Sequence, residues 1–186
     1  MLRIAIALLV TLGVAVKPAR ADEIPPELEM AIQLKILSFD SALKDRASGD
    51  TIALAVLYTP DHRSDANHYV NVVSTLAEKN NLTVHGKKVR ALAVQITADL
   101  ADRLAGIAAL YVVGAIDASV VSGISRIAFA RKLPTLSSDR SYLSSGIAVA
   151  VVEKNGKPGI VVHAGNAKEC GMMLDSKLLR LAEVVK

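Results

Sequence analysis

An acid, an imidazole and a guanidinium stand in a row at Asp61, His62 and Arg63, shortly after the apolar run Thr51–Tyr58. Such a group could exchange a proton with a ligand, bind a metal ion or hold an anion. His68 could join His62 as a metal ligand, although this spacing across a loop and a helix start is more typical of solvated surface histidines. Neither a nucleophile nor an electrophilic partner accompanies the carboxylates, so these residues do not predict an enzyme.

No sequence pattern of a familiar cofactor, metal or catalytic site occurs in the chain. It lacks GxGxxG, a P-loop, HExxH, GxSxG and any cluster of Cys and His at ligand spacing. We therefore predict no cofactor, no metal and no catalytic residue. An enzyme is the last of the alternatives.

The first residues predict export. Arg3 provides a positive start, Ile4–Val16 is continuously apolar, and Ala19 and Ala21 stand at the small-residue positions of a cleavage site. We interpret residues 1–21 as a signal peptide and residues 22–186 as a periplasmic domain, with an uncleaved anchor as the alternative. The apolar run is shorter than the about 20 residues that a spanning helix needs, so no stable membrane insertion is expected after cleavage.

Charge and cysteine content narrow the class of partner. The chain has 22 Lys and Arg against 18 Asp and Glu, but the leader holds three of the basic residues and no acid, which leaves +1 for the rest. Without a basic stripe interleaved with aromatic side chains, nucleic acid is not an expected partner. Cys170 is the single cysteine, which excludes a disulfide within the chain and leaves a bridge between two protomers open.

Apolar runs alternate with amphipathic segments along the chain. Strands are expected at Thr51–Tyr58, Val89–Ile96, Ile107–Gly114 and in LPTLSS, and helices in the segments between them. Asn155-Gly156-Lys157 predicts the turn of an antiparallel hairpin. Short helices over Asn166–Cys170 and Ser176–Val185 complete the chain. The fold class is therefore α/β: a single domain with a mostly parallel central sheet flanked by helices, a C-terminal antiparallel hairpin and closing helices.

In an open α/β sheet, ligands bind outside the carboxyl ends of the strands, where the strand order reverses. A flavodoxin-like order would place this crevice between the loops after Thr51–Tyr58 and Ile107–Gly114. Arg63 and Arg140 could pair there with an anionic ligand or a partner's carboxylate. The alternative is that polar residues simply populate loops at strand ends. The candidate binding residues are Asp61, His62, Arg63, Asp117, Asp139 and Arg140.

The closing segment predicts a packing helix with an additional apolar surface. Its expected core stripe, at helical spacing, is Leu178, Leu181, Ala182 and Val185. Leu179 and Val184 widen that stripe, so we expect them to contribute to a dimer or partner surface.

PTLSSDRSYLSSGIAVAVVEKNGKPGIVVHAGNAKECGMMLDSKLLRLAEVV resembles the C-terminal half of the YfiR-type family of periplasmic proteins. The matching positions are Pro134, Ser138-Asp139, Gly146, Gly171-Met172 and the run from Asp175 to Ala182. Upstream, LAVLYTPD, VHGKKVRALAV and LYVVGA match more loosely. His163 departs from the family's usual Asn, the aromatic-rich end of the first helix is reduced to Phe39, and the cysteine pairs of some members are absent. Cys170 occupies a position that the family fills with a small residue, which favours packing over redox chemistry.

This resemblance implies a non-enzymatic periplasmic regulator without a cofactor. Such proteins typically bind and repress the periplasmic sensing domain of an inner-membrane signalling protein, most commonly a diguanylate cyclase, so cyclic-di-GMP signalling is the expected context. A sensor kinase is another expected partner, and a homodimer is compatible with the apolar closing segment. The main alternative is a small periplasmic solute-binding or ligand-sensing protein.

Overall fold

The computed structural model describes residues 24–186, so the signal peptide and cleavage site expected within residues 1–21 lie outside the described residues. The strands of this part are β1 (Thr51–Tyr58), β2 (Thr83–Val84), β3 (Lys87–Gln95), β4 (Ala109–Val112), β5 (Thr135–Ser137), β6 (Val149–Lys154), β7 (Lys157–His163) and β8 (Glu183–Val185). The α-helices are α1 (Pro26–Leu37), α2 (Arg63–Lys79), α3 (Leu100–Arg103), α4 (Ala118–Arg131), α5 (Ala164–Glu169) and α6 (Ser176–Leu181). Three short 3-10 helices are η1 (Leu43–Arg46), η2 (Pro60–His62) and η3 (Arg140–Ser145).

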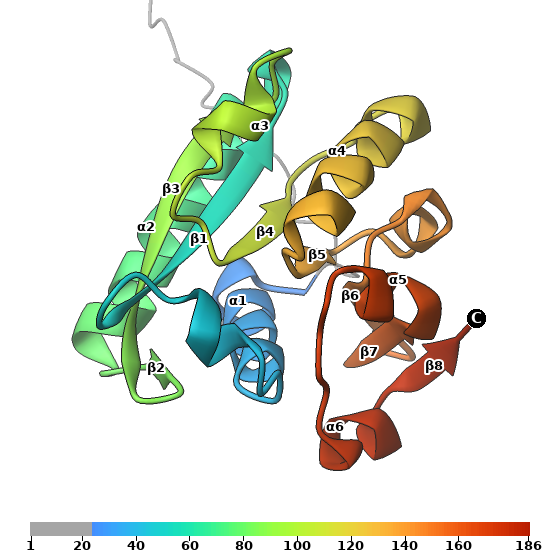
Figure 1. Ribbon diagram of the computed structural model, residues 1–186. Coiled ribbons are helices and arrows are strands. Elements are labelled where there is room, and N and C mark those ends of the chain that lie inside the picture. Colours follow the sequence, from blue (N-terminus) through green and yellow to red (C-terminus); the bar gives the residue numbers. More distant parts are fainter. Residues whose placement is uncertain (1–23) are drawn as a thin grey trace, which may run out of the picture.

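All eight strands belong to one sheet, in the order β2-β3-β1-β4-β5-β6-β7-β8 (Figure 1). Strands β3, β1, β4, β5 and β6 run parallel to one another, β2 is antiparallel to β3, and β6 and β7 form the antiparallel hairpin. The hairpin turns at Asn155 and Gly156, which both have positive φ, as a two-residue turn of the predicted kind requires. The predicted α/β fold class is confirmed.

Strand β1 lies at the centre because its side chains are apolar on both faces. Every residue from Ile52 to Tyr58 is buried, and β1 pairs along its length with β3, from Thr51 opposite Lys88 to Tyr58 opposite Gln95. On its other side it pairs with β4. Strands buried on both faces are expected to be continuously apolar, so the sequence identified this strand to the residue.

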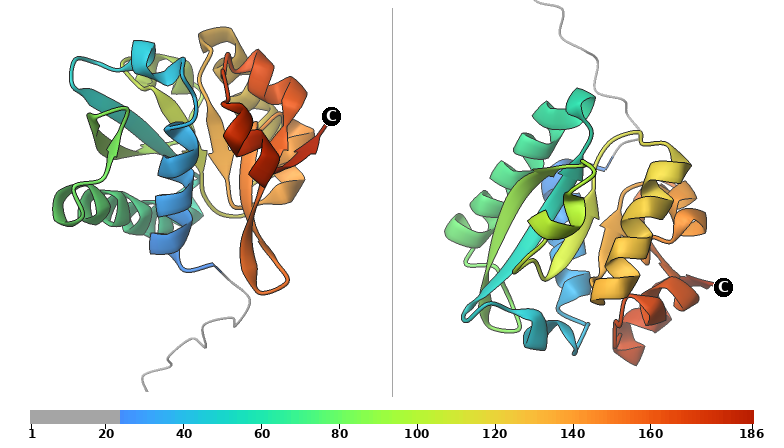
Figure 2. Two further views of the ribbon diagram at one scale, coloured as in Figure 1. Left: turned by 90° about the horizontal axis from the view of Figure 1, so that it is seen from below. Right: turned by 45° about the horizontal axis from the view of Figure 1, so that its top comes forward.

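Helices cover the two faces of the sheet unequally. In Figure 1, α2 lies behind β1 and β3, whereas α3 and α4 lie in front of the sheet, and α1 packs against α2 (Figures 1 and 2). Helix α3 has only 4 residues. Part of the face formed by β1 and β3 is therefore left without a covering helix.

A buried carboxylate joins α1 to the sheet. Glu29 of α1 is 2% exposed and accepts a hydrogen bond of 2.9 Å from the Tyr69 hydroxyl and a second one from the Tyr111 hydroxyl. Burial and then the charge of Glu29 raise the pKa of Tyr111 well above its ordinary value, so Tyr111 keeps its proton and remains a donor. This pairing allows α1 to cross the core with an acidic residue on its inner side.

The closing helix is shorter than predicted. Helix α6 ends at Leu181, and Glu183–Val185 form β8, which pairs in parallel with β7. The expected core position of Leu181 is wrong: its side chain is 74% exposed, while Leu178 is buried as predicted. Two adjacent β-branched residues, Val184 and Val185, favour a strand, and the edge of β7 offers the hydrogen-bonding partner.

Candidate partner and ligand sites

The sequence predicted a binding crevice where the strand order reverses, and this point lies between β1 and β4. These two strands are parallel neighbours, and β3 lies on the far side of β1, so the order reverses between them as in a flavodoxin-like sheet. The loop after β1 carries Asp61, His62 and Arg63, and the loop after β4 carries Gly114 and Asp117. Their carboxyl ends meet at one edge of the sheet, as the sequence predicted.

His62, in the loop after β1, packs against Gly114 in the loop after β4. An added Cβ on Gly114, which has φ +83°, would lie 2.3 Å from Cγ of the His62 ring. His62 Nδ1 also lies 3.0 Å from Asp65 Oδ2 in the first turn of α2. The imidazole therefore joins the two loops, and only glycine at position 114 leaves room for it.

Tyr142 also holds the loop after β4, through two hydrogen bonds. Its hydroxyl donates to the Gly114 carbonyl at 2.8 Å and accepts from the Ile116 amide at 2.6 Å. Because this residue lies on η3, it joins the loop after β4 to the segment after β5. Sequence reasoning missed Tyr142, and only its place after a short apolar strand could have indicated it.

The remaining candidates differ in what they contact. Asp61 and Asp117 are exposed, and neither side chain forms a hydrogen bond or ion pair with the described residues. Arg63 Nε contacts the Tyr58 hydroxyl at 3.4 Å and is otherwise open to solvent. Among the candidates in the loops after β1 and β4, these three side chains are the ones left open to solvent.

Asp139 and Arg140 serve the chain's own structure. Asp139 caps η3: its Oδ1 accepts from the Ser141 amide at 2.8 Å and from the Ser141 hydroxyl at 2.7 Å. Arg140 pairs with Glu183 of β8, so its guanidinium already has an anionic partner within the chain. Binding of a ligand by Arg140 would have to compete with this ion pair.

The C-terminal segment exposes four large apolar side chains. We name Met173, Leu179, Leu181 and Val184 the C-terminal patch, with exposed fractions of 64%, 38%, 74% and 46%. Among residues 24–186, the only other large apolar side chain in this exposure class is Leu28 of α1. Leu179 and Val184 are thus exposed beside a buried Leu178, as the sequence predicted. Exposed apolar side chains of this size are candidates for protein–protein contact.

The thiol of Cys170 is buried and poorly reactive. It is fully buried, its sulfur lies 3.6 Å from the Thr135 hydroxyl, and burial raises the pKa of its thiol to about 11. A thiol that remains protonated is a poor nucleophile. Within residues 24–186, no group of three His, Cys, Asp or Glu side chains could hold a metal ion, and none of the helices described there is long and apolar enough to cross a membrane.

Three solved structures share the fold at low sequence identity. A conserved domain protein from Vibrio cholerae O1 biovar El Tor matches with a TM-score of 0.58, 18% identity, and coverage of 87% of this chain and 60% of that one. A substrate-binding protein with adhesive properties from Clostridium difficile, in its ligand-free open form, matches with a TM-score of 0.54 and 18% identity, over 78% of this chain and 57% of that one. An ABC domain in complex with L-Trp from Streptococcus pneumoniae matches with a TM-score of 0.52 and 16% identity, over 81% of this chain and 62% of that one. The chain spans about three fifths of the length of these proteins, and the likeness concerns the fold alone.

Sequence comparison assigns the family. No curated protein sequence matches the chain. The model of a family described as YfiR/HmsC-like matches residues 26–183, which is nearly the whole described structure. The chain therefore belongs to the YfiR/HmsC-like family, a family of periplasmic regulatory proteins.

Proposed function

We propose that this protein binds the periplasmic sensing domain of an inner-membrane signalling protein and holds that protein inactive, with a diguanylate cyclase as the expected partner. The C-terminal patch is the observation that supports the proposal. Four of its side chains are apolar and exposed within a short stretch of chain, which places hydrophobic area where a partner can cover it. A dimer of two copies would use the same kind of surface, so dimer and partner contacts could compete there.

The charge and helix length of this segment suit protein contact better than membrane contact. Lys177, Arg180 and Lys186 are the basic residues of the segment from α6 to Lys186, and Glu183 is an acid between them. A helix that binds a membrane surface needs a long, strongly basic polar face, and α6 has 6 residues. We therefore assign the patch to a folded protein partner with a complementary apolar surface and a polar rim.

Deletion of the gene tests the cyclase version of this proposal. A repressor that is removed leaves its cyclase active, so cellular cyclic-di-GMP should rise and fall again when the gene is restored. An unchanged nucleotide level in the deletion strain would exclude a cyclase partner under those growth conditions. A sensor kinase would then have to be sought through the phosphorylation state of its response regulator.

Ligand sensing at the crevice is the second candidate function. Asp61, Arg63 and Asp117 are exposed at the point where the strand order reverses, and both signs of charge are present there. His62, Asp139 and Arg140 would act indirectly, because each of them is already engaged within the chain. Nuclear magnetic resonance titration with free amino acids as the probe tests this function: saturable shifts at Asp61 and Arg63 support it, and their absence removes it for that class of ligand.

A further inference from the structure

Strand β3 has an open edge. Its pairing with β1 extends over eight residue pairs, from Thr51 with Lys88 to Tyr58 with Gln95. On the opposite edge, β2 pairs only with Lys87 and Lys88. From Val89 to Gln95, no strand of the described structure lies beside β3 on that side. Figure 1 shows β3 and β8 near opposite ends of the sheet.

The hydrogen bonds to β1 show which backbone groups face outward. The Lys88 amide donates to the Asp50 carbonyl at 2.9 Å, and the Ile96 amide donates to the Tyr58 carbonyl at 2.9 Å. Backbone groups of alternate residues point to opposite edges of a strand, so even-numbered residues turn their amides toward β1. The amides and carbonyls of Val89, Ala91 and Ala93 consequently point to the open edge.

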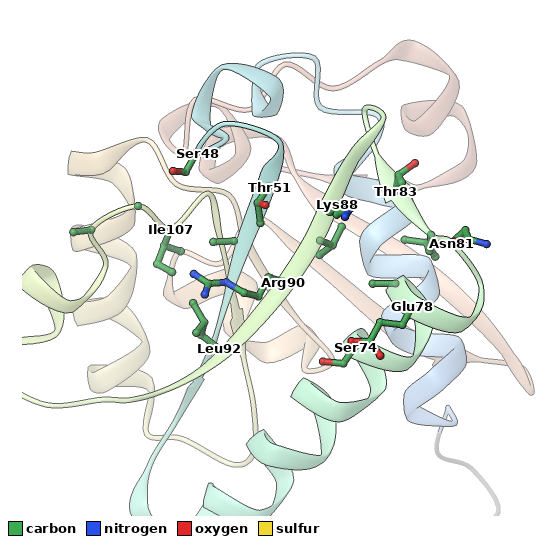
Figure 3. Close-up of a pocket in the computed structure, with 16 residues that line it drawn as sticks. Ser48, Thr51, Ser74, Glu78, Asn81, Thr83, Lys88, Arg90, Leu92 and Ile107 are labelled. Carbon is green, nitrogen blue, oxygen red and sulfur yellow. The ribbon is translucent and has the colours of Figure 1, made fainter.

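A cavity of about 820 Å³ borders this edge and extends over the neighbouring face of β1 (Figure 3). On one side it is lined by Lys88, Arg90 and Leu92 of β3, and on the other by Ser74 and Glu78 of α2. Helix α2 and the Arg90 side chain belong to different faces of the sheet, so a cavity that touches both must pass around the edge of β3. An extended peptide laid along that edge would direct its side chains alternately to the two sides.

Charge defines the side chains that such a peptide needs. Lys88 and Arg90 are exposed, and within residues 24–186 neither side chain has an ion-pair or hydrogen-bond partner. Acidic residues facing them would satisfy two cations, whereas residues facing Ser74 and Glu78 should be uncharged or basic. Arg103 Nη1 donates to the Gln95 carbonyl at 3.1 Å, which closes the available edge at its carboxyl end.

We propose that the open edge of β3 binds an extended segment of a partner protein by strand addition, and that alternate side chains of this segment are acidic and face Lys88 and Arg90. Backbone hydrogen bonds to Ala91 and Ala93 provide the affinity, and the two cations set the register. Strands β3 and β8 lie near opposite ends of the sheet, and the site on β3 shares no residue with the C-terminal patch, so it is independent of the function proposed above and can be occupied at the same time.

Cations on an edge strand also have a purely protective role, because they discourage pairing between copies. The two roles make different predictions for a peptide probe. A fluorescent peptide of sequence Glu-Val-Glu-Val-Glu-Val should bind the purified protein saturably, and the Lys-Val-Lys-Val-Lys-Val peptide should not. Amide hydrogen exchange at Ala91 and Ala93 should slow when the acidic peptide is bound, since strand addition engages those amides directly.

Two variants separate backbone pairing from charge. Ala93→Pro removes one outward amide without touching the bonds to β1, because proline is tolerated where the amide points away from the sheet. Arg90→Glu reverses a charge that faces the cavity. Each should weaken peptide binding about tenfold or more while thermal melting stays near that of the wild type. Arg126→Glu on α4, an exposed arginine outside this cavity, is the matched control and should bind normally.

Three results would overturn the proposal. One is the absence of saturable binding by the acidic peptide. Another is a folded Arg90→Glu protein that binds the acidic peptide as tightly as the wild type does but aggregates. The two cations would then only protect the edge against pairing between copies. The third is a self-associating wild type whose association disappears in Ala93→Pro, because the edge would then belong to a second copy of this chain.

Discussion

Arg140 and Glu183 form a two-pronged ion pair that joins η3 to the last strand of the sheet. Arg140 Nη1 donates to Glu183 Oε2 at 3.1 Å, Arg140 Nη2 donates to Oε1, and Lys154 Nζ adds a contact of 3.3 Å to Oε2. The pair fixes the backbone of β8 next to β7, so that Val184 is presented on the C-terminal patch. A residue expected to receive a ligand thus helps to position the surface that supports the proposed function.

This ion pair predicts a pH-dependent stability of β8. Hydrogen bonds from Arg140 and then Lys154 lower the pKa of Glu183 from 4.5 to about 2. A carboxyl group with a lowered pKa in the folded state stabilises that state above its unfolded pKa, and the contribution is lost as the pH falls from about 4.5 to about 2. Glu183→Gln should therefore melt below the wild type at pH 7, and the difference should vanish over that acidic range. An equal difference at both ends of the range would contradict the assignment.

Among the acidic residues near the C-terminal segment, Asp40 should cost the most stability when it is substituted. It is fully buried, and its carboxylate accepts from the amides of Ala42 and Met173 at 3.1 and 2.8 Å and from Arg46 Nη1 at 3.1 Å. Asp40→Ala leaves buried donors unpaired and should lower the free energy of unfolding by about 3 kcal/mol. Asp40→Asn retains an acceptor for the amides and should cost less. Chemical denaturation measures both, and equal losses would show that the amide contacts carry no weight.

Truncation of Leu178 should destabilise the fold much more than truncation of Leu181. Leu178→Ala opens a cavity in the core and should lower the free energy of unfolding by about 2–5 kcal/mol. Leu181→Ala removes an exposed side chain and should change it by less than about 0.5 kcal/mol. Urea denaturation of the two variants tests the placement of α6. A large loss of unfolding free energy in Leu181→Ala would contradict this placement and support the longer helix that the sequence predicted.

Gly114 and His62 should show strong coupling in a double-mutant cycle. Gly114→Ala places a methyl group against the His62 ring and strains a backbone with φ +83°, so it should destabilise the fold by about 1–3 kcal/mol. His62→Ala removes the ring, and the double variant should lose less stability than the sum of the single ones. Simple additivity in thermal melting would mean that the backbone strain alone sets the cost.

Sequence reasoning succeeded where one local signal dominates. The continuous apolar run of β1 and the Asn155-Gly156 turn are of this kind, and both lie where predicted. It failed where a tertiary contact overrides a local pattern. Ser176–Val185 has helical periodicity, yet the edge of β7 and the contact between Arg140 and Glu183 convert its end into β8.

The candidate site shows the same division. Asp61, His62, Arg63 and Asp117 could be placed at one edge because they follow predicted strands. The contact of His62 with Gly114, the tyrosine bridge from Tyr142 and the capping role of Asp139 depend on which loops become neighbours in space, and the sequence does not encode these contacts at any fixed spacing.

The most direct test of the central claim is the cellular level of cyclic-di-GMP in a strain that lacks this protein and is complemented with variants of the C-terminal patch. The decisive variant carries Leu179→Asp and Leu181→Asp, and Leu28→Asp is its matched control, because Leu28 is 45% exposed on α1 rather than in the patch. Wild type and Leu28→Asp should lower the nucleotide, and a folded, exported patch variant should leave it high, because charge in an apolar interface is costly. Full restoration by that folded patch variant would contradict the account.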